Sequence, residues 1–570
     1  MKKIILFICI LIFNQIIFAQ KDQYYDFIKT WNFIKYYHPD VASGKIDADS
    51  LFLNTIKNIN SKDDFNSVIH KLSQNLNKNL TIPAPAEASK DILTQNQNFD
   101  WYQKNGKISS ENKNLLHTIY NHRYNFELLK EGKLVSTEKK YPFPKNENLP
   151  LEYRLLTLAK IQGVVDYLFP HKYIMDKGFE DYFKNSLEEN SKITSRKDFE
   201  TLLAKLTSKL KDSHAFNFYN QLNYRGDILN MLYLAPFDFQ IIDDHILVTH
   251  LIFPEICSKA QINVGDRIFS INGKSIPQII KEKGELLSTS NREKLVFLLS
   301  KYETNLIWPD NLPQKNLEVK SGKTGKKFTA KLDMINIKDK EKYDFIVSYL
   351  KDKIKKIENR QIINKNVAYF KANETLEFIN NINDNKIDAV MDSILSNAAQ
   401  KKTIIFDMRA YPDWGGFFYH YIYKYFSPTD NYFGKYYEPN LKNIGTFTYK
   451  DDDYFPLISG KTTHPYKGKV FILVNPDTRS AGEWYSMSLQ KIFPQSLTIG
   501  QQTSGGDGDL VKVNLPGDYL LEFTGNGIFY PDNAQTQQIG IRINEIIKYK
   551  DKDILENRDL EFERILSLVK

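Results

Sequence analysis

Cysteine is nearly absent from this chain of 570 residues, which contains only Cys9 and Cys257. A disulfide framework or a cysteine-rich metal cluster needs more thiols, so neither is expected. The 21 prolines and 26 glycines are too few for a low-complexity scaffold. Beyond the first 18 residues the sequence also has no apolar run long enough to cross a membrane.

Charge of one sign is scarce too. The net charge of +8 is the difference between 77 basic and 69 acidic side chains, and no block of Lys and Arg is present. Nucleic-acid binding normally needs such a block, so it is not expected. The contents of 42% apolar and 26% charged residues are typical of a folded soluble protein. At this length we expect two to four domains.

The first residues have the pattern of a secretory signal. Lys2 and Lys3 precede two apolar stretches, at 4–13 and 16–18, and Ala19 supplies the small residue before a cleavage point. A membrane anchor is the alternative, but polar residues at 14 and 15 interrupt the run. The sequence therefore predicts a signal peptide over 1–19 and a periplasmic or secreted protein.

An internal duplication marks the N-terminal part of the chain. One apolar stripe of helical spacing, which begins at Phe65, recurs 134 residues later from Phe199. Upstream, the stretches that end at Pro39 and Pro170 also match. We expect related helical regions over 20–150 and 151–228. Only the second copy ends in Asp212-Ser-His214.

A small β domain is expected over 229–335. Apolar or alternating strands at 237–242 and 245–253 precede a Gly-Asp turn, a strand and a closing Asn-Gly over 265–273. One helix is expected near 293–299. A generic β-barrel insert remains an alternative on these residues alone.

Strands and helices alternate over 336–570. The pattern predicts strands at 367–371, 403–407, 470–474 and 496–500, helices at 387–399 and 480–492, and a hairpin around Pro516-Gly517. The connections are long enough for crossovers between parallel strands, so an α/β domain is expected.

Ser480 stands directly after one of these buried strands and opens a helix. A hydroxyl there lies at the positive end of the helix dipole, which favours a developing negative charge. A capping box with Glu483 is the structural alternative. Gly415-Gly416 follows another buried strand, and these two loops could together form a nucleophile and an oxyanion pocket. A plain glycine turn is the alternative.

The order of these features resembles the C-terminal-processing and tricorn-type family of serine peptidases. That resemblance implies a multidomain α/β protein with a helical N-terminal region, a PDZ-like β domain and a clp/crotonase-like α/β domain. The motifs that carry it are Asp212-Ser-His214, Gly265 to Gly273, Asp407-x-Arg with Gly415-Gly416, Ser480-Ala-x-Glu483 and Ile499-Gly-x-x-Thr-x-Gly505.

By this resemblance Ser480 is the nucleophile, and the backbone N–H groups of Gly416 and Ala481 are the oxyanion donors. The processing branch takes its base from a lysine, but Gly506 stands at that position and no other lysine looks suited by burial to act as a base. The tricorn-like branch uses a histidine after a serine, which Ser213-His214 matches. The resemblance therefore implies His214 as the base, with Ser213 in support.

The sequence also departs from the family. Gln537 stands where the tricorn-like branch has an acid that helps to orient the histidine, and Ile543-Asn544 replaces the family's Pro-Asp. A glutamine does not stabilise an imidazolium as a carboxylate does. A catalytically weak or inactive member that acts as a peptide-binding protein is therefore an alternative.

The leading hypothesis is a secreted or periplasmic serine endopeptidase. Its partners would be polypeptide substrates, which the PDZ-like domain would bind in part as an added strand. The resemblance implies neither a metal nor an organic cofactor. An acyl-CoA enzyme of the crotonase type would share the α/β architecture, but it would explain neither the PDZ-like segment nor the signal peptide.

Overall fold

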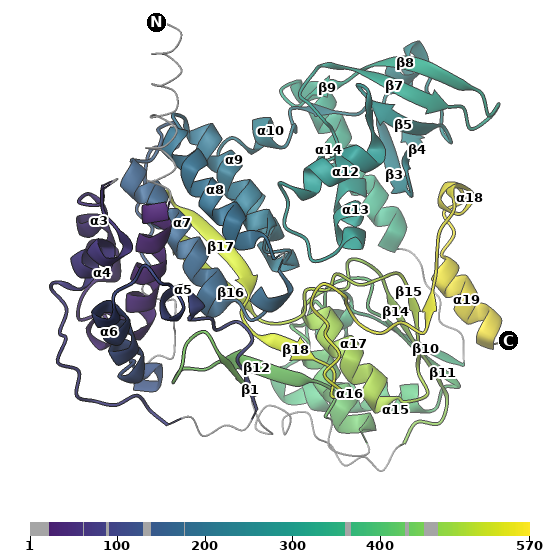
Figure 1. The fold of residues 1–570 in the computed structure, drawn as a ribbon. Coiled ribbons are helices and arrows are strands. Elements are labelled where there is room, and N and C mark those ends of the chain that lie inside the picture. Colours follow the sequence, from purple (N-terminus) through teal and green to yellow (C-terminus); the bar gives the residue numbers. More distant parts are fainter. Residues whose placement is uncertain are drawn as a thin grey trace, which may run out of the picture. The chain divides into compact units, whose positions relative to one another are not determined.

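The computed structural model describes residues 22–60, 62–86, 91–128, 138–175, 177–358, 366–427, 432–449 and 465–569 (Figure 1). The chain divides into two compact units. Unit 1 combines residues 1–223 with 436–450 and 509–527, and unit 2 combines 224–435, 451–508 and 528–570. The predicted signal peptide at 1–19 lies outside the described residues.

Unit 1 is mainly helical. Its first helix covers residues 22–37. The first copy continues with α2 (Pro39–Ala42), α3 (Ala48–Ile56), α4 (Phe65–Ser73), α5 (Asp100–Gln103) and α6 (Ser110–Asn121). The second copy contains α7 (Leu151–Gly163), a π-helical turn (Val164–Leu168), α8 (Phe179–Lys192), α9 (Arg196–Ser208) and a 3-10 segment (Ser213–Gln221).

The two apolar stripes form helices, as the spacing predicts. The stripe from Phe65 lies in α4, where the Asp64 side chain accepts a hydrogen bond from the Ser67 N–H at 2.8 Å. The stripe from Phe199 lies in α9, where the Ser195 hydroxyl accepts from the Asp198 N–H at 3.1 Å. The stripe residues inside both helices are buried. Each helix thus begins at a side-chain cap and turns its apolar face to the core.

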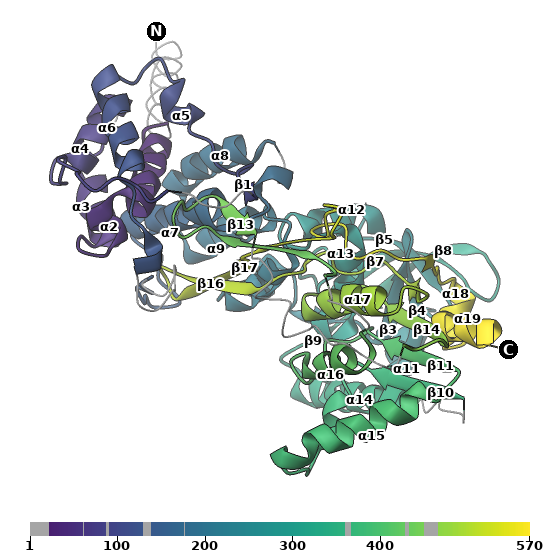
Figure 2. The ribbon, with the colours of Figure 1, turned by 90° about the horizontal axis from the view of Figure 1, so that it is seen from below.

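A hairpin from the C-terminal part of the chain belongs to unit 1. Strands β16 (Leu510–Leu515) and β17 (Tyr519–Thr524) pair antiparallel around the predicted Pro516-Gly517 turn. Arg196 on α9 donates to the Gly517 carbonyl at 3.0 Å, and the Leu520 N–H donates to Gln221 at 2.8 Å. Figure 2 shows the hairpin beside α7 and α9. In the same unit, β13 (Phe447–Tyr449) pairs with β1 (Ile92–Leu93) and with residues 437–439 of β12 (Lys435–Pro439).

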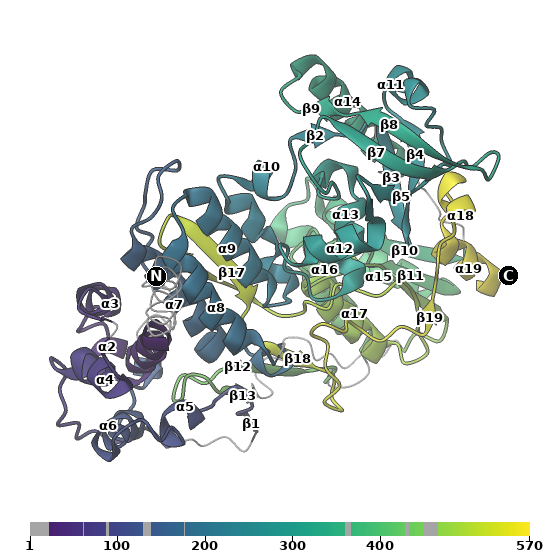
Figure 3. The same cartoon turned by 45° about the horizontal axis from the view of Figure 1, so that its top comes forward.

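The first part of unit 2 contains an antiparallel sheet (Figure 3). The strand order is β3 (Phe237–Ile242), β4 (His245–Leu251), β5 (Arg267–Ile271), β7 (Gln314–Lys320) and β8 (Lys327–Asp333), with β6 (Lys274–Ser275) paired to β5. The helices are α10 (Arg225–Ile228), α11 (Pro254–Lys259), α12 (Ile276–Gly284), α13 (Arg292–Ser300) and α14 (Lys340–Glu358), and β2 (Tyr233–Leu234) pairs with β9 (Ile335–Asn336).

The glycines at the two ends of the 265–273 motif have positive φ angles. Gly265 has φ 89° and Gly273 has φ 78°, which side chains with a Cβ rarely adopt. The carboxylate of Asp266 accepts hydrogen bonds from the N–H groups of Asn263 at 2.8 Å and Gly322 at 2.9 Å. The motif therefore serves to turn the chain into β5.

The second part of unit 2 contains a five-stranded parallel sheet. Its order is β10 (Val367–Lys371), β11 (Thr403–Asp407), β14 (Lys469–Val474), β15 (Leu497–Gly500) and β19 (Glu545–Ile546). Its other elements are α15 (Ile387–Ala399), α16 (Phe417–Phe426), α17 (Ala481–Ile492), β18 (Gly527–Phe529), α18 (Asp551–Leu555) and α19 (Leu560–Val569). The predicted α/β pattern is confirmed, since each expected strand agrees within one residue.

Apolar side chains of the sheet pack with α19. Ile405, Phe471 and Leu473 form one buried cluster with Phe562 and Ile565 of that helix.

Cys257 is also buried, and burial raises the pKa of its thiol to about 12. In the ranges that the structure describes, no helix combines the length and apolar content needed to span a bilayer.

Candidate active site

The loops that carry Ser480 and Gly416 follow neighbouring strands. β11 and β14 are paired in parallel, with Asp407 opposite Leu473, so both strands end at the same edge of the sheet. The buried hydroxyl of Thr478 donates to the carbonyl of Met408 at 2.7 Å and joins the two loops. The sequence-based expectation that these loops face each other is confirmed.

Ser480 has an unusual backbone conformation. Its φ is 48° and its ψ is −124°, a region that residues with a side chain rarely adopt. The hydroxyl is half-buried and donates to the Gly508 carbonyl at 3.2 Å. Because of this conformation α17 begins at Ala481, one residue later than predicted. Ser480 therefore stands directly before α17, and its hydroxyl lies beside the N-terminus of that helix.

The capping-box alternative is wrong. Ser480 makes no side-chain cap bond to α17. The carboxylate of Glu483 instead accepts hydrogen bonds from the Thr503 hydroxyl at 2.6 Å, the Gly505 N–H at 2.8 Å and the Gly506 N–H at 3.0 Å. The Ser480 N–H in turn donates to the Gly506 carbonyl at 3.2 Å. Glu483 therefore fixes the glycine loop on which Ser480 rests.

The Glu483 side chain is fully buried. Burial raises the pKa of its carboxyl, although the hydrogen bonds from Thr503, Gly505 and Gly506 and the charge of Lys294 act in the opposite direction. Both carboxylate oxygens are engaged by this loop. The geometry suits Glu483 to a structural role in the site.

The backbone of Gly415 and Gly416 also requires glycine. Their φ angles are 51° and 86°, and a Cβ on Gly416 would lie 2.0 Å from the Tyr485 ring of α17. Ala481 is the first residue of α17, and the first N–H groups of a helix have no acceptor inside it. Both residues that the family resemblance implies as oxyanion donors therefore stand on loops that meet at the edge of the sheet.

His214 belongs to unit 1 and lies in a compact polar network. Its Nδ1 is 2.8 Å from the Thr524 hydroxyl, which donates to Asp212 Oδ1 at 2.8 Å. Asp212 also accepts from the N–H groups of Thr524 at 2.6 Å and His214 at 3.1 Å. The imidazole is 13% exposed, whereas the carboxylate of Asp212 is 0% exposed.

The charge of Asp212 suits it to orient this imidazole. Burial raises the pKa of its carboxyl, but the hydrogen bond and charge of His214 and the hydrogen bonds from Thr524 outweigh burial and hold the pKa below its ordinary value. Asp212 belongs to the motif at 212–214, but no role for it follows from the sequence alone. No local pattern pointed to Thr524, which is 310 residues from His214.

The remaining predicted residues are divided between the units. Ser213, 9% exposed, is in unit 1 with His214. Gln537 is buried in unit 2, and its backbone carbonyl accepts a hydrogen bond from the Gln535 side chain at 2.7 Å. Ser480 is also in unit 2, so its pairing with His214 stays a prediction.

The sequence-based expectation about lysines is wrong. Burial lowers the pKa of Lys283 to about 7 and that of Lys294 to about 8. Lys283 donates to the Leu229 carbonyl at 2.6 Å. Lys294 donates to the Pro476 carbonyl at 2.9 Å in the loop that leads to Ser480, and lies 3.4 Å from Asp477 Oδ1. Lys294 therefore helps to hold the loop that leads to Ser480. This role depends on the fold and was not predicted from the sequence.

The glycine loop after Ser480 is also held by α13, the helix that carries Lys294. Asn291, the N-cap of α13, donates through its side chain to the Thr503 carbonyl at 2.8 Å. Together with Lys294, it connects α13 to loops on both sides of Ser480. A helix of the antiparallel β domain thus supports the candidate active site.

The edge strand β3 of the antiparallel sheet is capped by side chains. The N–H of Phe239 donates to Asp238 Oδ1 at 2.7 Å, and the N–H of Ile241 donates to Ser300 Oγ of α13 at 3.1 Å. An added strand at this edge would have to displace both contacts.

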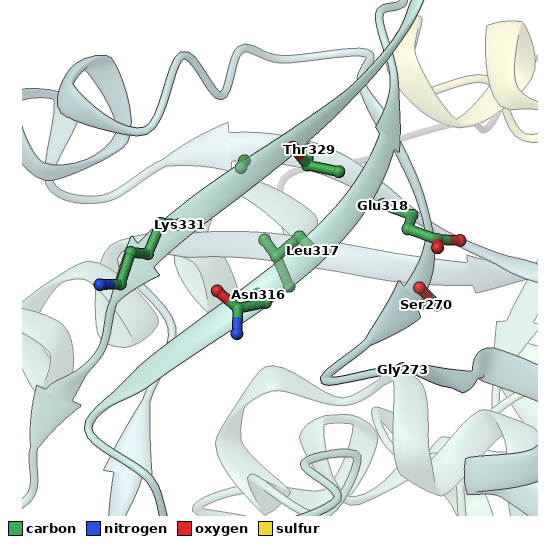
Figure 4. Close-up of a pocket in the computed structure, with 8 residues that line it drawn as sticks. Ser270, Gly273, Asn316, Leu317, Glu318, Thr329 and Lys331 are labelled. Atoms are coloured by element: carbon green, nitrogen blue, oxygen red, sulfur yellow. The ribbon is translucent and has the colours of Figure 1, made fainter.

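A separate depression of about 350 Å³ lies over β5, β7 and β8 (Figure 4). Ser270, Glu318 and Thr329 occupy one row across the three strands. Ser270 is 6% exposed, and its hydroxyl has no hydrogen-bond partner among the described residues. Each of the three strands therefore contributes at least one polar side chain to the depression.

Comparisons with known proteins identify the family of the α/β region. Residues 367–547 match the model of Peptidase family S41. No curated protein matches the chain. Mature CPAF is 11% identical, with 74% of this chain and 96% of that chain covered and a TM-score of 0.49. The tricorn protease is 14% identical, with 74% and 36% covered and a TM-score of 0.33.

The photosystem II D1 C-terminal processing protease is 13% identical, with 69% of this chain and 92% of that chain covered and a TM-score of 0.31. The match over residues 367–547 confirms the resemblance to the C-terminal-processing and tricorn-type serine peptidases, and a peptidase family implies polypeptide substrates.

Proposed function

We propose that this protein is a serine endopeptidase in which Ser480 is the nucleophile and His214 is the general base. The observation that carries the proposal is the conformation of Ser480, with φ 48° in a loop held by Glu483 at the N-terminus of α17. Backbone strain of this kind is retained where the surrounding structure enforces it, and such residues cluster at active sites. The matched family gives the chemistry.

In the proposed reaction the Ser480 hydroxyl attacks the carbonyl carbon of a peptide bond. His214 takes the hydroxyl proton and returns it to the leaving amine, so that an acyl-enzyme forms and the C–N bond breaks. Water then attacks the acyl-enzyme, with His214 again as the base, and releases the acid and the serine. The N–H groups of Gly416 and Ala481 hold the oxyanion in both steps.

Asp212 and Thr524 support the proposed base. A carboxylate of lowered pKa beside Nδ1, joined to it by a hydroxyl, favours the tautomer in which Nε2 can accept a proton. This network offers an acid for the role that Gln537 does not fill. It favours the enzyme over the alternative of an inactive peptide-binding member.

A fluorophosphonate probe tests the proposal, because it reacts with activated serines. We expect covalent labelling of Ser480, with loss of labelling in Ser480→Ala and retention in Ser567→Ala, a serine on α19. His214→Ala should lower turnover by about 10²- to 10⁴-fold. The double variant with Ser480→Ala should be little worse than the poorer single variant. Absence of labelling in the parent protein would favour the peptide-binding alternative.

We further propose that residues 229–335 form a PDZ-like domain that recognises part of the substrate as a strand added to β3. The antiparallel order of the sheet and the helix α13 against β3 support this proposal. Its direct test is the Ser300→Ala variant described below, because deletion of the domain would also remove Lys294 and its support of the Ser480 loop.

The predicted domain boundaries at 150, 228 and 335 and the periplasmic or secreted location remain part of the proposal. The sequence of residues 1–19 supports export. The mature protein should begin at Gln20, which intact-mass measurement of exported protein checks. Retention of residues 1–19 in that protein would contradict it.

A further inference from the structure

Three aromatic residues flank Gly415-Gly416 in the sequence, and we call them the aromatic rim: Tyr411, Trp414 and Phe417. Tyr411 is 44% exposed and Phe417 is 58% exposed, and Trp414 is half-buried. The rings of Trp414 and Phe417 have centroids 6.5 Å apart. Burial of a large aromatic side chain is favourable. A bound molecule that covers these exposed rings would therefore be stabilised.

The rim borders the candidate nucleophile. Phe417 follows Gly416 directly and begins α16. On the other side, the guanidinium of Arg479 lies 5.3 Å from the ring centroid of Tyr411, and Arg479 is the residue before Ser480. A Cβ on Gly482 would lie 3.8 Å from the ring of Pro412, so the rim loop also packs on the start of α17.

Arg479 adds a charge to this apolar border. Its side chain is exposed, and within the described residues no carboxylate forms an ion pair with it. Asp477, two residues away, is engaged by Lys294 and Lys301 at 3.4 and 3.7 Å. A guanidinium that is not neutralised by the chain favours a carboxylate of a bound molecule.

We infer that the aromatic rim and Arg479 form a specificity site for a polypeptide that presents a large apolar side chain next to a carboxylate. The inference rests on the proposed function, since it takes Ser480 as the nucleophile. The rings bury the apolar side chain, and Arg479 pairs with the carboxylate. That carboxylate comes either from an Asp or Glu side chain or from the end of the substrate chain.

Matched fluorogenic peptides test the site in the full-length protein. One series compares Leu with Ser at the apolar position, and a second compares Glu with Gln at the neighbouring position. A third compares a free C-terminal acid with its amide. For the parent protein we expect kcat/KM to be at least about tenfold higher for Leu than for Ser, in line with the discrimination that an apolar contact provides. We also expect a preference for the Glu series, the free-acid series or both, which identifies the source of the carboxylate.

The variants separate the two contacts. Tyr411→Ser and Phe417→Ser should each reduce the Leu preference several-fold, and Arg479→Gln should reduce only the carboxylate preference. The matched control is Tyr343→Ser on α14, since Tyr343 is 43% exposed, and it should change neither preference. The inference would be overturned if Tyr411→Ser, Phe417→Ser and Arg479→Gln all left both preferences unchanged.

Failure of the proposed function gives a different result. In that case the parent protein cleaves none of the peptides and Ser480 is not labelled by a fluorophosphonate, and the inference falls with it. Labelling of Ser480 together with equal cleavage of every peptide in a pair overturns the specificity site alone.

Discussion

Two buried carboxylates stand beside the two proposed catalytic residues, and their pKa values shift in opposite directions. In unit 1, Asp212 lies next to His214, and its pKa is lowered despite burial. In unit 2, Glu483 lies one helical turn from Ser480, and its pKa is raised. Both carboxylates accept hydrogen bonds from backbone N–H groups and a threonine hydroxyl.

The difference between them is the neighbouring imidazole. Asp212 has a group beside it that can carry a positive charge, 3.7 Å from Oδ1, whereas the oxygens of Glu483 are met by neutral donors. The hydrogen bonds and the charge of Lys294 therefore do not offset burial at Glu483, whereas the hydrogen bonds and the adjacent imidazole do so at Asp212. Asp212 is thus suited to orient the proposed base, His214, and Glu483 supports the loop of the proposed nucleophile, Ser480.

The largest expected effect comes from removal of the charge at Asp212. Asp212→Asn keeps the shape of the side chain but no longer favours the required tautomer of His214, so turnover should fall by about 10²- to 10⁴-fold. Steady-state kinetics on a polypeptide substrate measures this. Glu483→Gln is the control and should cost much less. An equal loss in both variants would contradict the division of roles.

The next effect concerns the loop that Glu483 holds. Glu483→Ala leaves the N–H groups of Gly505 and Gly506 and the Thr503 hydroxyl without this acceptor, and each orphaned buried donor costs about 1–3 kcal/mol. Amide hydrogen exchange over 503–506 should accelerate by at least about tenfold. Glu483→Gln should fall between the parent and Glu483→Ala, because an amide retains one acceptor. Exchange in the 522–526 segment serves as the internal control.

The opposite pKa shifts predict opposite responses to acid. The folded-state pKa of Glu483 is raised, so the stability of its loop should increase as the pH falls toward its ordinary pKa of about 4.3. The folded-state pKa of Asp212 is lowered, so its contribution is complete above about pH 3.9 and is lost as the pH falls through the lower folded-state value.

Hydrogen exchange measured across this pH range, corrected for the intrinsic exchange rate, checks both signs. Opening of 503–506 should become rarer on acidification, and opening around Thr524 should become more frequent below about pH 3.9. A response of the same sign in both segments would show that the two carboxylates do not differ as described.

The smallest expected effect lies at the edge of the antiparallel sheet. Ser300→Ala frees the N–H of Ile241, which now donates to Ser300 Oγ at 3.1 Å. If β3 accepts a substrate strand, KM for long polypeptides should fall about two- to fivefold, which corresponds to about 0.5–1 kcal/mol, the lower part of the range for one hydrogen bond. KM for short reporter peptides should stay unchanged. An unchanged KM for both would remove β3 as the docking edge.

Much of the local structure was predictable because it depends on residues close in sequence. The apolar stripe from Phe199 and the capping residue Ser195 specify α9, and the buried run at 403–407 forms β11 as expected. Parallel order also follows from the long connections, and it brings the Ser480 and Gly416 loops to one edge. The family motifs supplied the candidate roles of Ser480, Gly416 and Ala481.

Other features depend on contacts between distant residues. The sequence by itself identified Ser480 and His214 as the candidate nucleophile and base, and it shows that a carboxylate stands two residues before His214. Only the tertiary structure decided that Thr524 completes the network of Asp212, that Glu483 binds the glycine loop instead of capping its helix, and that Lys294 is buried against Pro476. The physical reason is that hydrogen-bond partners and pKa shifts depend on burial and on neighbours in space, which periodicity and spacing along the chain do not encode.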